Sequence, residues 1–301
     1  MGGDFAKSAA KRLATVCAAC ICAAAVCAEK PAADKPAAEA EDTPPPELED
    51  TAFRGWLEAS TELSFYSAYV WRGQILFDRP VWQPAQNLLL KFGENAEYGA
   101  LKFRLWANFA IDGNKPPHRF GGMSIVDERV GYVKTFFDCL DFDVGAIFYQ
   151  FPNRHSRGLR ETDEFIAGVK WRNPYLTPSF YMWWDFDENG HNDENALFFD
   201  FDFTHAFAIT DALSLNLGSG FGVANGSYMD HYTHGGVDGP AFNYFHHDLG
   251  LWYKITDNIK VGTSLTYFYN LSRQVRHSSY DMHDHYNAGI LRGGIHLVVT
   301  W

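Results

Sequence analysis

The segment that decides the fold runs from Ala196 to Thr210 and reads ALFFDFDFTHAFAIT. Large apolar side chains occupy almost every second position, and aspartate, threonine and alanine fill most of the positions between them. Such period-two alternation predicts a β-strand with one apolar face and one polar face. The apolar face would carry Leu197, Phe199, Phe201, Phe203, Phe207 and Ile209, and the polar face Asp200, Asp202 and Thr204.

The length of this segment indicates a membrane strand. Strands of soluble proteins usually have about five or six residues, whereas a strand that crosses a bilayer needs about 9–11. The alternation here continues for fifteen residues. We therefore expect a transmembrane antiparallel β-barrel, with phenylalanine against lipid and aspartate toward a wet interior.

The start of the chain has the features of an export signal. Basic residues precede the apolar run Leu13–Val26, and small residues suit cleavage after Ala28, as in a Sec-type signal peptide. The residues that follow are rich in acids and prolines and have no apolar period, which predicts a disordered periplasmic linker. We therefore divide the chain into a signal peptide at 1–28, a linker at 29–52 and an outer-membrane barrel at 53–301.

Alternating segments recur along the rest of the chain and predict about twelve strands, an even number as in bacterial outer-membrane barrels. Short connections alternate with long ones, which predicts periplasmic turns, extracellular loops and both termini in the periplasm. The strands expected to run outward are Trp56–Trp71, Gly99–Asp112, Asp141–Phe151, Pro178–Phe186, Leu213–Val223 and Ile259–Leu271. The strands expected to return are Val81–Phe92, Ile125–Phe137, Glu164–Arg172, Ala196–Thr210, Asn243–Ile255 and Tyr286–Trp301.

Tryptophan and tyrosine stand at many of the predicted strand ends, where membrane barrels carry aromatic girdles. The rival fold is a soluble β-sandwich or lipocalin-like barrel with an aromatic core, but its strands would seldom exceed about ten residues. The expected girdle residues are Tyr69, Trp71, Trp184, Tyr267 and Tyr269 at the outer ends, and Trp171, Tyr253 and Trp301 at the periplasmic ends.

The end of the chain carries a possible assembly signal. Leu297, Val299 and Trp301 share one face of the last predicted strand, and an aromatic residue ends the chain. This resembles the C-terminal β-signal of outer-membrane proteins, in which phenylalanine is the usual last residue. The resemblance implies that the barrel-assembly machinery and outer-membrane lipid are partners of the chain and that Trp301 is the assembly signal.

A short motif ends the first predicted strand. It has the form S-x-Y-x-x-R-G, with a proline and a glutamine further on, and its residues are Ser67, Tyr69, Val70, Arg72, Gly73, Pro80, Gln83 and Pro84. It resembles the opening signature of a family of Gram-negative outer-membrane-type β-barrel proteins of unknown function, which implies a location and a fold. The layout is also similar to that of twelve-stranded nucleoside-specific outer-membrane channels, by architecture alone.

Arg72 has two interpretations. It is either a rim charge beside a turn glycine, or an arginine facing the lumen near the mouth that pairs with an acid and positions a loop. We favour the first, because Arg-Gly pairs at loop edges are common in turns.

The predicted lumen carries charges of both signs, which must be paired or hydrated. Twelve strands enclose a modest interior, and inward aromatic residues would narrow it, either by packing or as a stacking surface for a planar or sugar-like solute. The candidate channel residues are Glu58, Glu62, Arg72, Lys102, Arg104, Asp185, Asp200, Asp202, Asp248 and Arg292, with the aromatic residues Tyr66, Trp106, Trp183 and Trp252.

Histidines gather in the predicted extracellular loops and in the strand ends that feed them. We place ten of the twelve there, namely His118, His155, His191, His231, His234, His246, His247, His277, His283 and His285. Histidine and aspartate at short spacing suit Zn²⁺ or another divalent ion, and the candidate ligands are His231, His234, His283 and His285. The alternative is the ordinary composition of hydrated loops, and no other cofactor is expected.

The function favoured by these patterns is a narrow or gated porin-like channel for small solutes. The alternative is a non-conducting surface barrel, structural or solute-binding, which could bind a divalent metal through its loops. No motif of a hydrolase, nucleotide-binding site or metalloprotease occurs, so we do not expect an enzyme. The formal net charge of −12 argues against nucleic acid as a partner.

Overall fold

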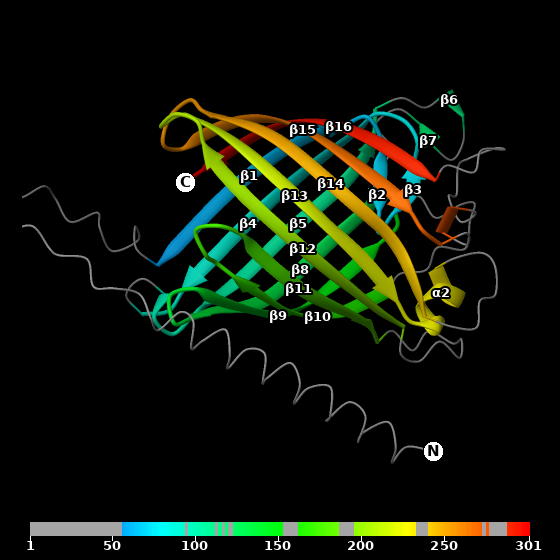
Figure 1. Cartoon of the computed structure of the whole chain (residues 1–301), viewed down its shortest axis with the longest axis horizontal. Helices are drawn as coiled ribbons and strands as arrows, with labels where there is room; N and C mark the ends of the chain where they lie inside the picture. The colour runs from blue at the N-terminus through cyan, green and yellow to red at the C-terminus, as the bar shows by residue number, and fades with distance from the viewer. Residues whose placement is uncertain are drawn as a thin grey trace, which may run out of the picture.

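A computed structural model of the chain describes residues 56–93, 96–111, 114–115, 118–119, 123–152, 162–186, 196–232, 240–272, 275–276 and 288–301. Within this part of the chain, twelve antiparallel strands close into a single barrel (Figure 1). The predicted signal peptide and linker lie outside the described residues.

The barrel strands follow one another in chain order, and β1 pairs with β16 to close the sheet. The predicted number and order of strands are confirmed, and most boundaries agree within a few residues. The barrel strands are β1 (Leu57–Tyr66), β4 (Val81–Lys91), β5 (Ala100–Ala110), β8 (Met123–Phe136), β9 (Leu140–Gln150), β10 (Thr162–Trp171), β11 (Thr177–Asp185), β12 (Leu197–Ala208), β13 (Leu213–Ala224), β14 (Ala241–Lys254), β15 (Ile259–Asn270) and β16 (Gly289–Thr300).

The first predicted strand was too long. The stretch Trp56–Trp71 is not one strand, because β1 ends at Tyr66 and the chain then forms a separate hairpin of β2 (Tyr69–Trp71) and β3 (Gln74–Phe77). Arg72 and Gly73 make its turn with φ angles of 49° and 79°. Two successive positive φ angles are typical of the tight turns that reverse a hairpin.

Two further elements lie outside the barrel sheet. The strands β6 (Asn114–Lys115) and β7 (His118–Arg119) form a small hairpin, and α2 covers Gly226–Tyr232. Figure 1 shows β2, β3 and α2 at one end of the barrel and the C-terminus at the other end. In the described residues, no helix has the length and apolar character needed to cross a bilayer.

The two faces of the sheet differ as the alternation predicts. Outward side chains remain exposed although they are apolar, for example Phe203 at 41%, Leu249 at 45% and Leu265 at 42%. Asp200 and Asp202, which alternate with the outward phenylalanines of β12, line a cavity inside the barrel. An apolar outer surface around a polar interior is the arrangement of an outer-membrane β-barrel, and this is the fold of the chain.

The predicted aromatic girdle is correct for most of its members and wrong for two. Trp184, Tyr253, Tyr267, Tyr269 and Trp301 are exposed on the barrel strands or at their ends. Tyr69 and Trp71 instead belong to the β2–β3 hairpin, and Tyr69 is buried. Their alternation continues that of β1, so periodicity alone could not separate the hairpin from the strand.

Candidate functional site

The β2–β3 hairpin packs against the inner wall of the barrel through two apolar clusters. On one side, Tyr69 and Phe77 join a cluster whose other buried members come from β4, β5 and β8, namely Val81, Ala110 and Ile125. On the other side, Val70 and Ile75 join a cluster formed largely by β12, β14, β15 and β16, with Phe198, Tyr244, Phe268 and Ile290. The hairpin therefore bridges opposite walls of the barrel at the end where α2 lies.

At the tip of the hairpin, Arg72 makes a buried bidentate ion pair with Glu164 of β10. Nη1 donates to Oε1 at 2.7 Å, and Nη2 donates to Oε2 at 2.6 Å. The side chains are only 7% and 1% exposed, and Tyr149 also donates to Glu164 Oε2 at 2.8 Å. Of the two interpretations of Arg72, the structure therefore supports the second, and the rim charge that we favoured is wrong.

Aromatic rings surround the Arg72 guanidinium. Its central carbon lies 4.6 Å from the ring centre of Trp71, 5.2 Å from that of Trp183, 4.6 Å from that of Phe198 and 5.4 Å from that of Tyr228. A cation held over ring faces gains further electrostatic stabilisation. These rings come from the hairpin, β11, β12 and α2, so one side chain connects four elements at the mouth.

The helix α2 adds hydrogen bonds to this assembly. The Tyr228 hydroxyl accepts a bond from Arg72 Nη1 at 3.3 Å, and the Tyr232 hydroxyl donates to Asp185 Oδ2 at 2.5 Å. Trp71 and Tyr232 also meet edge to face, with ring centres 5.3 Å apart. The assembly of hairpin, α2 and inner wall is called the mouth plug below.

The ion pair keeps Arg72 charged. Burial alone would lower the pKa of the guanidinium, but the Glu164 carboxylate outweighs it and holds the pKa well above the ordinary value. Arg72 therefore stays charged in this pair at physiological pH.

Other polar groups of the mouth plug are poorly satisfied. The side-chain amides of Gln74, Asn243 and Asn270 are buried, and none of their nitrogen or oxygen atoms has a hydrogen-bond partner in the part of the chain that the structure describes. Buried amides without protein partners are normally bound to ordered water. The seat of the hairpin is thus held mainly by apolar contacts and by the single pair of Arg72 with Glu164.

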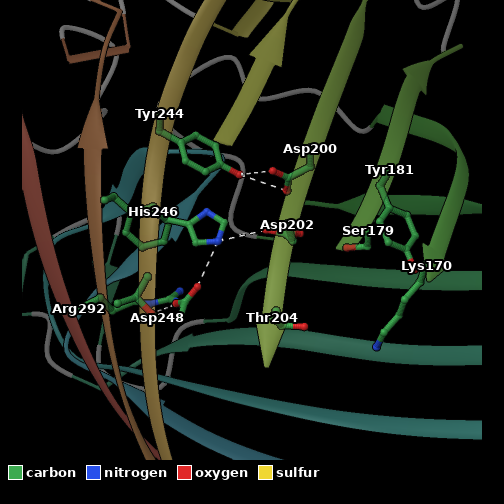
Figure 2. Close-up of a pocket in the computed structure, with 12 residues that line it drawn as sticks. Lys170, Ser179, Tyr181, Asp200, Asp202, Thr204, Tyr244, His246, Asp248 and Arg292 are labelled. Atoms are coloured by element: carbon green, nitrogen blue, oxygen red, sulfur yellow. Dashed lines mark hydrogen bonds and ion pairs between the residues drawn. The ribbon is translucent and has the colours of Figure 1, made fainter. Parts of the chain in front are cut away.

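Farther along the barrel, one wall of the lumen is acidic (Figure 2). His246 Nε2 of β14 lies 3.1 Å from Asp202 Oδ1 of β12 and 3.1 Å from Asp248 Oδ2. The Tyr244 hydroxyl donates to Asp200 and lies 3.2 Å from each of its carboxylate oxygens. We call Asp200, Asp202, Asp248, Tyr244 and His246 the acidic wall.

Glycine on the intervening strand permits this cluster. Gly220 of β13 lies between Asp202 and His246 in the strand register. A Cβ atom at Gly220 would overlap Asp202 Oδ1, His246 Cε1 and the backbone oxygen of Phe201. The side chains of β12 and β14 therefore meet across β13 only because β13 has no side chain there.

The opposite wall is basic. Lys102 Nζ lies 3.2 Å and Arg129 Nη2 lies 2.8 Å from the same oxygen of Asp143, and Arg104 of β5 pairs in register with Arg129 of β8. In the closed strand order, β5 and β8 lie about half a turn of the barrel away from β12 and β14. Three cations share this wall with the carboxylates of Asp127 and Asp143, so a mainly basic wall faces the acidic wall across the lumen.

A cavity of about 440 Å³ lies against the acidic wall. Besides the acidic wall, it is lined by Lys170, Ser179, Tyr181, Thr204, Thr266, Phe268 and Arg292. A volume of this order is typical of sites for small molecules.

The predicted charged lumen residues lie on the inward faces of their strands. Glu58 forms an ion pair with Lys91 of β4, Asp185 contacts the mouth plug, and Arg292 lines the cavity. The same phase places Glu62, Lys102, Arg104, Asp200, Asp202 and Asp248 inside. That any of them lines a path for solute stays a prediction.

The predicted aromatic lumen residues pack against other protein groups. Trp183 contacts Arg72, and Tyr66 lies under Arg292 with its ring centre 4.4 Å from the guanidinium carbon. Trp106 packs on Tyr69 of the hairpin with ring centres 5.6 Å apart, and Trp252 stacks on His296 at 5.3 Å. The structure therefore favours interior packing over a stacking surface for solute.

Sequence reasoning missed the roles of Glu164, Tyr228 and His246. Glu164 alternates with outward Phe165 at the start of β10, so its inward direction was readable, but its partner is 92 residues away in sequence. His246 and His247 were placed at a loop or strand end, which is wrong, since both lie inside β14. The run of glycines at alternate positions 218, 220 and 222 was the signal that large side chains from neighbouring strands meet over β13.

The histidine-rich metal site stays a prediction. The side chains of His231, His234, His283 and His285 lie outside the described residues. Where the structure does describe side chains, it contains no group of three or more metal-ligating residues able to hold an ion.

One polar pair faces outward. Ser219 Oγ and His247 Nδ1 lie 2.8 Å apart on neighbouring strands β13 and β14. They share their face with the exposed side chains Leu217, Phe245 and Leu249, each two positions away along its strand. A hydrogen-bonded serine and histidine on an apolar face is unusual in a barrel exterior.

No family model and no curated protein matches the chain, so the resemblance carried by the first-strand motif stays a prediction. Among solved structures, the NanC porin aligns at a TM-score of 0.48 with 11% identity, covering 80% of this chain and 98% of that one. An outer-membrane channel from Pseudomonas putida F1 aligns at 0.48 with 8% identity, covering 85% and 100%. Outer-membrane phospholipase A from Escherichia coli aligns at 0.44 with 9% identity, covering 80% and 92%. Because channels and an enzyme both appear at such low identity, the likeness does not distinguish between the two.

Proposed function

We propose that this chain is an outer-membrane channel for small hydrophilic solutes, and that the mouth plug closes it. The observation that carries the proposal is the charged lumen. An interior that only had to be filled would be stabilised by apolar side chains, because buried charges are costly unless they are paired or hydrated. Here Lys102, Arg104 and Arg129 face the acidic wall across the barrel.

Closure at the mouth explains how such a lumen avoids being permanently open. The hairpin bridges the barrel walls through its two apolar clusters. Its only ion pair to the wall among the described residues is that of Arg72 with Glu164. The pair acts as a latch. Without it, only apolar contacts would hold the hairpin in place, and the buried amides beside them have no hydrogen-bond partner among the described residues.

Single-channel recording in planar bilayers tests the proposal. The double substitution Arg72→Met, Glu164→Gln removes both charges at similar volume and leaves neither partner as an unpaired buried ion. We expect this variant to be open for a larger fraction of time than the wild type. The matched control is Asp78→Asn, Arg79→Gln, which removes an ion pair that is about half exposed just beyond the hairpin and should leave gating unchanged.

The alternative of a non-conducting barrel makes the opposite prediction. If the latch variant inserts as a folded barrel and carries no current under any applied voltage, the channel proposal is wrong. If the control variant opens as often as the latch variant, the latch is wrong while conduction through the lumen stands.

The channel proposal includes the absence of enzymatic activity. An esterase would most readily use Ser219 and His247, whose side chains are hydrogen-bonded on the lipid face. A serine nucleophile also needs a group that orients the histidine and donors for the oxyanion. In the described part of the chain, the His247 side chain has no hydrogen bond other than the one to Ser219.

A lipid-hydrolysis assay checks this part of the proposal. We expect refolded wild-type protein in phospholipid micelles to release fatty acid no faster than Ser219→Ala. A serine-dependent release of fatty acid would contradict it and would make the outward pair an active site.

A further inference from the structure

The cavity beside the acidic wall contains charges of both signs that are not all in direct ion pairs. Among the described residues, the Asp200 side chain is hydrogen-bonded only to the Tyr244 hydroxyl and forms no ion pair. Asp202 and Asp248 share one histidine, His246, and remain in excess of it even when the imidazole is protonated.

In the described part of the chain, neither Lys170 nor Arg292 forms a direct ion pair with these acids. Among the described residues, the Lys170 side chain forms no hydrogen bond or ion pair, although Lys170 lines the cavity. Arg292 donates to Thr266 Oγ1 at 3.4 Å and packs on the rings of Tyr66 and Phe268, and its Nε atom is buried without a partner. Figure 2 shows Lys170 on the side of the cavity away from Tyr244 and His246.

The strand register sets the spacing of the backbone positions that carry the opposite charges. Lys170, Ser179 and Asp202 form one row across β10, β11 and β12. Adjacent strands lie about 4.8 Å apart, so the backbones at Lys170 and Asp202 are separated by about 10 Å. A short molecule with a positive group at one end and a negative group at the other can bridge such a gap.

We propose that this cavity binds a small zwitterion, such as a free amino acid or a dipeptide. Its ammonium group would lie between Asp200 and Asp202, and its carboxylate would pair with the Lys170 ammonium. This inference rests on the proposed channel function and names the class of solute. A simple cation would meet Lys170, and a simple anion would meet the acidic wall, so each would leave charges of the cavity unpaired.

Calorimetric titration of the refolded wild-type barrel with alanyl-alanine tests the proposal. Two modified ligands isolate its two charges: N-acetyl-alanyl-alanine lacks the ammonium group, and alanyl-alanine amide lacks the carboxylate. Because a hydrogen bond to a charged group is worth about 1.5–3 kcal/mol, each modification should weaken binding at least about tenfold.

Substitutions in the protein make the test specific. In Asp200→Asn, the preference for alanyl-alanine over its N-acetyl form should fall, while the preference over the amide remains. In Lys170→Met, the preference over the amide should fall, while the preference over the N-acetyl form remains. The control Lys260→Gln removes a charge of β15 that does not line the cavity, and it should retain both preferences.

Each outcome decides the proposal. Equal binding of the three ligands, no binding of alanyl-alanine to the wild type, or loss of both preferences in Lys260→Gln would overturn it. Current recorded in parallel separates this failure from failure of the channel. A latch variant that conducts but binds none of the ligands overturns the zwitterion site alone, whereas binding without current overturns the channel alone.

Discussion

At the scale of single residues, the alternation of apolar and polar residues predicts which face of the barrel each side chain points to. Asp200 and Phe201 are neighbours in the chain, yet Asp200 lines the inner cavity and Phe201 stacks on Phe221 of the next strand at 4.7 Å between ring centres. The sequence alone assigned both residues to the correct faces. It did so because the period of two is a property of the extended backbone and does not depend on distant contacts.

The two faces predict different effects of substitution at these neighbours. Phe201→Arg places a charge on the lipid face near the middle of β12, and it should cost about 2–4 kcal/mol of folding free energy. Asp200→Asn keeps an acceptor for the Tyr244 hydroxyl and should fold normally. Urea unfolding in lipid vesicles measures both, and equal losses would contradict the assignment of faces.

Glycine at position 220 is required by the size of its neighbours. Gly220→Ala should destabilise the barrel by about 1–3 kcal/mol, because a methyl group there overlaps atoms of Asp202 and His246. The control is Gly293→Ala on β16, where a Cβ would meet nothing within 4 Å. Unfolding midpoints compare the two variants, and an unchanged midpoint for Gly220→Ala would count against the close approach of β12 and β14.

At the scale of elements, the barrel strands were predictable and the mouth plug was not. Each barrel strand repeats its own alternation, so its position follows from local sequence. The hairpin β2–β3 also alternates, and what separates it from β1 is contact with residues far away in sequence. Arg72 finds Glu164 at a separation of 92 residues and Tyr228 at a separation of 156, which no local pattern reveals.

The buried ion pair predicts that one substitution is worse than two. Glu164→Gln alone leaves the Arg72 guanidinium buried without a carboxylate and should cost about 3–5 kcal/mol. Arg72→Met with Glu164→Gln leaves no unpaired charge and should cost less. The comparison uses unfolding midpoints of the two variants. If the double variant is the less stable one, the mouth plug tolerates a buried Arg72 without its carboxylate, and the premise that the two charges depend on each other is wrong.

The closing pair of strands gives a prediction about assembly. Trp301 donates its backbone N–H to Ala59 of β1 at 2.9 Å, directly after the β1–β16 ladder. If the final aromatic residue is the signal for the assembly machinery, deletion of Trp301 should remove the heat-modifiable barrel from outer membranes. Refolding of the same variant in detergent is the control, because the loss of one terminal bond should leave it nearly intact. Normal levels in the membrane would contradict the role of Trp301.

At the scale of the whole molecule, the chain combines an apolar exterior, a lumen with opposite charges on opposite walls and a plug at one end. The sequence predicted the exterior and the charged interior, because both follow from alternation. It could not predict the pairing of charges across strands or the closure of the mouth, since these depend on the strand order and on where the hairpin lies. The proposed function therefore depends on contacts between residues that are far apart in the sequence.

The central claim is that solute passes through the charged lumen once the mouth plug is released. Cysteine substitution at two neighbouring residues of β12 tests it most directly, in the latch variant with Cys139 replaced by serine. Thr204→Cys faces the cavity, and Phe203→Cys faces outward. We predict that a charged, membrane-impermeant methanethiosulfonate reagent blocks the current through the Thr204→Cys channel and leaves that of Phe203→Cys unchanged. Equal block of both channels, or current in Thr204→Cys that the reagent does not alter, would contradict the account.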